Sequence, residues 1–94
     1  MFELVQSGLP KETMRLIKDF TQGPVRVSLF HWNNKYLIKL EAGPMEQTFK
    51  IDEFDLESEQ QLHSLLDSEF LENCMKRFDE MYSQLRQAMK KLEQ

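Results

Sequence analysis

Three short segments in the middle of the chain alternate apolar and polar residues with a period of two. They span residues 25–32, 35–42 and 45–51 and are separated by the turn sequences Asn33-Asn34 and Gly43-Pro44. A period of two places alternate side chains on opposite faces of a strand, and asparagine tolerates the positive φ of a tight hairpin turn. The pattern therefore predicts a three-stranded antiparallel meander.

The two-residue turn at Asn33-Asn34 fixes how the first two strands pair. It sets Leu29 opposite Ile38 on a face that needs helices to cover it. The second turn brings Glu41 opposite Glu46, which is an unfavourable pair of like charges.

The segment before the meander has a different period. Met14, Ile17 and Phe20 recur at every third position, and Pro10 suits the first turn of a helix, where its missing N–H costs nothing. Gly23-Pro24 would end such a helix. We therefore expect an amino-terminal helix ahead of the strands.

Two helices are predicted after the meander. Ser58 and Gln61 have the spacing of a capping box at the start of a short helix. The apolar stripes before and after Asp67-Ser68 point more than roughly 100° apart, so a break is expected there. A long helix over residues 69–93 then carries a stripe at three-four spacing, made of Leu71, Cys74, Phe78, Met81, Leu85, Ala88 and Leu92.

The predicted fold class is α+β, and residues 1–94 form one small domain. A three-stranded antiparallel β-meander is flanked by an amino-terminal helix and a carboxy-terminal helical pair, in the order α-β-β-β-α-α. The composition, 40% hydrophobic and 30% charged, is that of an ordinary globular protein.

A cytoplasmic location is expected from three features. The single cysteine, Cys74, excludes an internal disulfide and favours a reducing compartment. Glu3 stands where a signal peptide needs a basic residue. No apolar run approaches the roughly 20 residues of a membrane span, so no contact with a membrane is expected.

The long helix suggests assembly. At 1.5 Å per residue it would extend about 37 Å, whereas an eight-residue strand covers about 27 Å. Its last turns, with Leu85, Met89 and Leu92, would overhang the sheet, and a second subunit is the simplest cover. We therefore expect a homodimer that acts as a non-enzymatic interaction or adaptor module with an unidentified protein partner. The competing interpretation packs the whole stripe within one chain.

The opposite face of the meander supports an alternative function. Aromatic and apolar side chains lie there beside basic ones and could stack on and neutralise a nucleotide or single-stranded nucleic acid. These residues are Phe30, Trp32, Lys35, Leu37, Lys39 and Lys50. The competing interpretation covers this face with residues 2–5 or a dimer partner. Duplex DNA is not an expected partner, because the net charge is −4 and residues 51–75 hold eight acids without a Lys or Arg.

No catalytic, cofactor or metal site is predicted. The acids between Asp52 and Glu59 lack the glycine and the final glutamate of a calcium loop, and they suit a solvated turn and helix start. His31 and His63 lie far apart, and His31 is expected on the core face beside Tyr36. Cys74, on the inner stripe, has the character of a small buried hydrophobe.

Residues 30–51, which read FHWNNKYLIKLEAGPMEQTFKI, resemble a family of short uncharacterised bacterial proteins. The resemblance covers the meander, about a quarter of the chain. It implies a bacterial, cytosolic origin and adds no site residue, since that family has no assigned activity.

Overall fold

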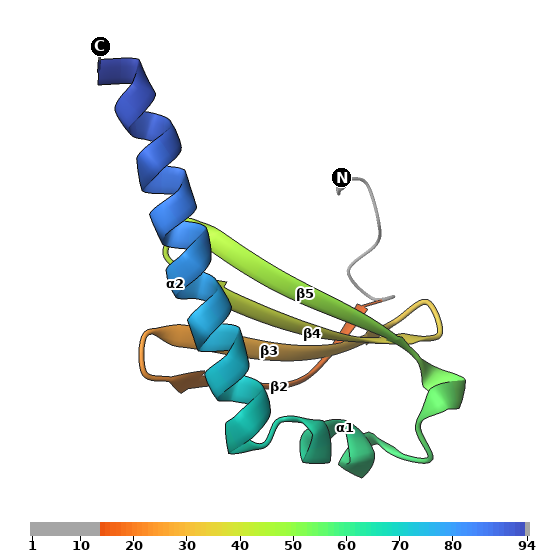
Figure 1. The fold of residues 1–94 in the computed structure, drawn as a ribbon. Helices are drawn as coiled ribbons and strands as arrows, with labels where there is room; N and C mark the ends of the chain where they lie inside the picture. Colours follow the sequence, from red (N-terminus) through yellow and green to blue (C-terminus); the bar gives the residue numbers. More distant parts are fainter. Residues whose placement is uncertain (1–13, 94) are drawn as a thin grey trace.

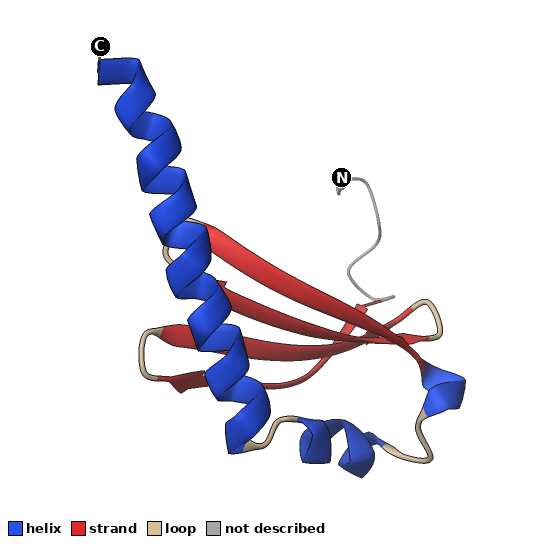
Figure 2. Ribbon diagram, viewed as in Figure 1, coloured by secondary structure: helices blue, strands red, loops and turns tan. Residues whose placement is uncertain are grey.

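The computed structural model describes residues 14–93, which form one antiparallel sheet crossed on one face by a long helix (Figures 1 and 2). The strands follow each other in the sheet in chain order: β2 (Met14–Gln22), β3 (Val25–Trp32), β4 (Lys35–Ala42) and β5 (Met45–Asp52). The remaining elements are η2 (Glu53–Asp55), α1 (Glu59–Leu65), α2 (Ser68–Lys90) and η3 (Lys91–Glu93). The α+β class and the carboxy-terminal helical pair are confirmed.

The prediction of an amino-terminal helix and three strands is wrong over the described residues. Met14–Gln22 is strand β2, so the sheet has four strands. Gly23-Pro24 does not end a helix but forms the turn between β2 and β3, with Gln22 paired to Val25. Pro10, the expected start of that helix, lies outside the described residues, as do residues 2–5.

A β-bulge explains the misleading spacing of three. The pairing of β2 with β3 shifts its register between Leu16 and Lys18, which leaves Ile17 as an extra residue in the strand. In a regular strand Ile17 and Phe20 would point to opposite faces. With the bulge, both pack against the core.

The predicted pairing of the other three strands is confirmed on both faces. Asn33 and Asn34 have φ angles of 53° and 63°, the left-handed conformation that a tight hairpin turn needs. Glu41 lies opposite Glu46, as the turn at Gly43-Pro44 predicts. Lys39 relieves their repulsion, because its Nζ lies 3.8 Å from a carboxylate oxygen of each glutamate.

The core lies between one face of the sheet and the two helices. β3 and β4 supply five of its buried side chains, α1 supplies one and the first half of α2 supplies three. These residues are Val25, Val27, Leu29, Ile38, Leu40, Leu62, Leu71, Cys74 and Phe78. The predicted burial of Cys74 is therefore confirmed.

The two helices begin where the sequence predicts. Asp67 lies in the break and caps α2, its Oδ1 accepting a hydrogen bond of 2.9 Å from the backbone N–H of Phe70. Ser58 precedes α1, but its side chain makes no capping hydrogen bond. The carboxamide oxygen of Gln61 accepts instead from the backbone N–H of Glu57 at 2.9 Å. A capping box uses the N–H of Ser58, so the predicted capping box does not form.

Gln47 holds α2 against strand β5. Its Nε2 donates to the backbone carbonyl of Cys74 at 2.9 Å, and its Oε1 accepts from Arg77 at 3.1 Å. Both ends of one side-chain amide therefore bind neighbouring positions of the helix. This fixes the point from which the rest of α2 continues past the sheet.

Candidate functional site

The carboxy-terminal half of α2 and the turn η3 extend beyond the edge of the sheet (Figure 1). We call residues 82–93 the projecting segment. Phe78, the last buried residue of α2, is 4% exposed. Four large side chains follow on the same stripe with much higher exposure: Tyr82 (48%), Leu85 (40%), Met89 (54%) and Leu92 (80%).

The overhang follows from the lengths of the elements. A helix of 23 residues extends about 35 Å, and an eight-residue strand about 27 Å. Because α2 crosses the sheet obliquely, its first half already reaches the far edge of the sheet (Figure 2). The structure thus places Leu85, Met89 and Leu92 together on the overhang, where the sequence predicts them.

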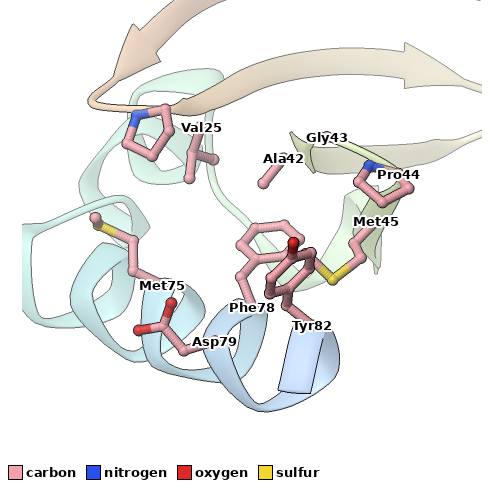
Figure 3. Close-up of a pocket in the computed structure, with 10 residues that line it drawn as sticks. Val25, Ala42, Gly43, Pro44, Met45, Met75, Phe78, Asp79 and Tyr82 are labelled. Atoms are coloured by element: carbon pink, nitrogen blue, oxygen red, sulfur yellow. The ribbon is translucent and has the colours of Figure 1, made fainter. Parts of the chain in front are cut away.

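A pocket of about 390 Å³ lies where the helix leaves the sheet. The ends of the two Gly-Pro hairpins form one side of it, and α2 forms the other. In Figure 3 the side chains of Phe78 and Tyr82 point from α2 toward the hairpin ends, where Ala42 and Met45 lie. Asp79 is the one charged side chain among the described residues that line the pocket. Tyr82 therefore belongs both to the pocket and to the exposed stripe.

Charged side chains of both signs lie at each end of this overhang. Its root has Lys76, Arg77, Asp79 and Glu80, and its tip has Lys90, Lys91 and Glu93. All seven are exposed. Arg86 lies between them, with its guanidinium 5.8 Å from the centre of the Tyr82 ring.

The second candidate surface is the face of the sheet away from the helices. Strand pairing brings all six predicted ligand-face residues onto it: Phe30, Trp32, Lys35, Leu37, Lys39 and Lys50. Phe30 and Trp32 are half-buried, and Leu37 is only 7% exposed, so Leu37 offers little surface to a ligand.

Basic residues on this face have acidic neighbours. Arg26 forms a 2.8 Å ion pair with Asp19 of β2, and Lys39 lies between two glutamates. Lys35 is paired across the strands with Asp52, which leaves Lys50 beside Leu37. The face therefore has little excess positive charge to attract a phosphate backbone.

Sequence reasoning missed two residues on this face, Met14 and Leu16, which pair with Trp32 and Phe30 and are about half exposed. They were missed because the segment was assigned to a helix. The signal that could have found them is the repeated Gly-Pro, since Gly23-Pro24 and Gly43-Pro44 each join two strands.

His31 contacts two neighbouring side chains, Tyr36 and Glu53. Its ring lies 5.0 Å from that of Tyr36, as predicted, and its Nε2 lies 2.6 Å from Oε1 of Glu53. Within residues 14–93 no group of three or more His, Cys, Asp or Glu side chains is placed to hold a metal ion. The helices of this part of the chain include none that is both long and apolar enough to cross a membrane.

Comparison of the chain with known protein families, curated proteins and solved structures found no match. The resemblance of residues 30–51 to short bacterial proteins stays a prediction. The molecule has two exposed surfaces that could bind a partner, the projecting segment and the uncovered sheet face.

Proposed function

We propose that this protein is a non-enzymatic, homodimeric interaction module whose subunits pair through the projecting segment of α2. The observation that supports it is the abrupt exposure of the apolar stripe after Phe78. Exposed apolar residues are ordinary when they are scattered singly, but a continuous patch marks an interaction site. Here four large side chains follow one another along about 15 Å of helix.

The commonest cover for such a patch is a second copy, paired about a two-fold axis. A dimer would leave the other face of each sheet accessible, with Met14 and Leu16 about half exposed. This is where we place the unidentified protein partner. A location in the cytoplasm is part of the proposal, because the single, buried Cys74 is typical of proteins kept in a reducing compartment.

The solution mass tests the proposal directly. Light scattering over a dilution series of the full chain is expected to give about twice 11.3 kDa at high concentration, with dissociation only on dilution. A mass of one chain throughout the series would overturn it. The projecting stripe would then be exposed in the working form of the protein.

The alternative function, binding of a nucleotide or single-stranded nucleic acid, depends on Trp32 and Phe30 as stacking partners. Its weakness is electrostatic, because Arg26 and Lys39 both lie beside acids. Only the half-buried aromatic side chains of this face support the alternative function.

Trp32 is the chain's one tryptophan, so its fluorescence reports on this face alone. We expect no change when nucleotides or single-stranded oligonucleotides are added at low salt, where binding to phosphate is strongest. A saturable quench that Lys50→Glu weakens and a higher salt concentration reverses would favour the alternative.

A further inference from the structure

We propose that the projecting segments of the two subunits pack antiparallel and that each one reaches the pocket beside Tyr82 of the other subunit. This inference rests on the dimer proposed above and specifies what the partner contacts. It is carried by two observations: the spacing of the exposed apolar residues and the pocket at the root of the segment.

The spacing of the stripe suits an antiparallel pair. When Leu85 lies opposite the partner's Met89, Tyr82 falls opposite the partner's Leu92, because both pairs of residue numbers have the same sum. All four exposed side chains then have an apolar counterpart. In this register the tip of each segment lies against the root of the other.

The pocket distinguishes the two possible directions. An antiparallel pair brings the tip of each segment to the root of the other, where the pocket lies. A parallel pair would set tip against tip and leave both pockets out of reach.

The helix pair alone is too small for a stable interface. Four side chains that are about half exposed, each with at most ~200 Å² of surface, would bury roughly 400 Å² per subunit, whereas a standard interface buries ~800 Å² on each side. More apolar surface must come from a neighbouring part of the molecule.

The pocket supplies that apolar surface. It is continuous with the stripe, because Tyr82 lines the pocket and also lies on the stripe. In the antiparallel register the side chain that reaches the pocket is the partner's Leu92, whose own 80% exposure is the highest of the four stripe residues. Met45 and Pro44 at the end of the β4–β5 hairpin would then contact the partner's η3.

Disulfide trapping tests the contact. Met45→Cys combined with Leu92→Cys is expected to give a covalent dimer under mild oxidation, since a disulfide needs Cα atoms within about 7 Å. Met45→Cys with Gln87→Cys is the matched control, because Gln87 lies on the polar side of the helix, and it should stay uncrosslinked. Cys74 can be retained, because it is fully buried.

The outcomes separate the two proposals. A wild-type dimer in light scattering that does not give the Met45–Leu92 crosslink would overturn the antiparallel contact and leave the dimer standing. A wild-type monomer at every concentration would overturn both. Trapping at Leu92 but not at Gln87 would support the contact.

Discussion

Replacing Leu85 and Met89 together by glutamate is expected to leave the protein monomeric across the whole dilution series while its fold is kept. Both side chains lie outside the core and are about half exposed, so neither substitution leaves a cavity. In the dimer the change would place four carboxylates against apolar side chains, and losing central contacts of this kind costs ~2 kcal/mol or more each. Light scattering measures the mass, and circular dichroism measures the fold.

A matched control is available on the same helix. Gln84→Glu with Gln87→Glu adds the same charge to the same segment, but both residues lie off the apolar stripe and are exposed. This variant should stay dimeric. If the Leu85 and Met89 variant is equally dimeric and equally stable, the stripe is not the interface. If both variants dissociate, added charge and not the stripe explains the result.

The strand pairing from β3 to β5 could be predicted because turn chemistry determines it locally. Two asparagines that accept positive φ leave a two-residue turn as the simplest connection, and every later pair follows from it. Even the unfavourable pair of Glu41 with Glu46 is present. The local pattern did not predict the role of Lys39. Its amine lies on the same face, at the neighbouring position, and offsets the repulsion between the two glutamates.

Strand β2 was missed because one inserted residue changes the period that separates a strand from a helix. The bulge at Ile17 brings Ile17 and Phe20 to the same face at a spacing of three. A periodicity argument treats that spacing as helical. Only the pairing with β3, which depends on residues farther along the chain, shows that the extra residue is accommodated in a sheet.

That error also affected the reading of the outer face. The basic residues were placed together correctly, but the partner of Arg26 is Asp19, which lies on β2. With Met14–Gln22 assigned to a helix, Asp19 had no predicted place on this face. The face therefore seemed more suited to a phosphate backbone than its ion pairs allow.

The projecting segment could be predicted from length alone, whereas the pocket could not. An overhang follows from the rise per residue of a helix and a strand. The pocket combines Pro24, Pro44 and Phe78, three positions far apart in the sequence. Their meeting depends on where α2 crosses the sheet, which is fixed by Gln47 binding the helix backbone.

Leu62→Ala is expected to lower the free energy of unfolding by about 2–5 kcal/mol, the range for a fully buried leucine. Leu62 is the one buried residue of α1, and a helix of seven residues is too short to persist without packing. The exposed ion pair of Arg15 with Glu59 also ties α1 to β2, but such pairs contribute less than about 1 kcal/mol. Urea unfolding at one fixed protein concentration measures the loss, because assembly shifts apparent stability.

Leu65→Ala provides the comparison within the same helix. Leu65 is 40% exposed, so its truncation removes fewer contacts and should cost less than about 1 kcal/mol. Equal effects of the two substitutions would mean that α1 is not held by Leu62. Because α1 leads directly into the Asp67 cap of α2, a loosened α1 should also fray the start of α2 while leaving the projecting segment, and with it the dimer mass, unchanged.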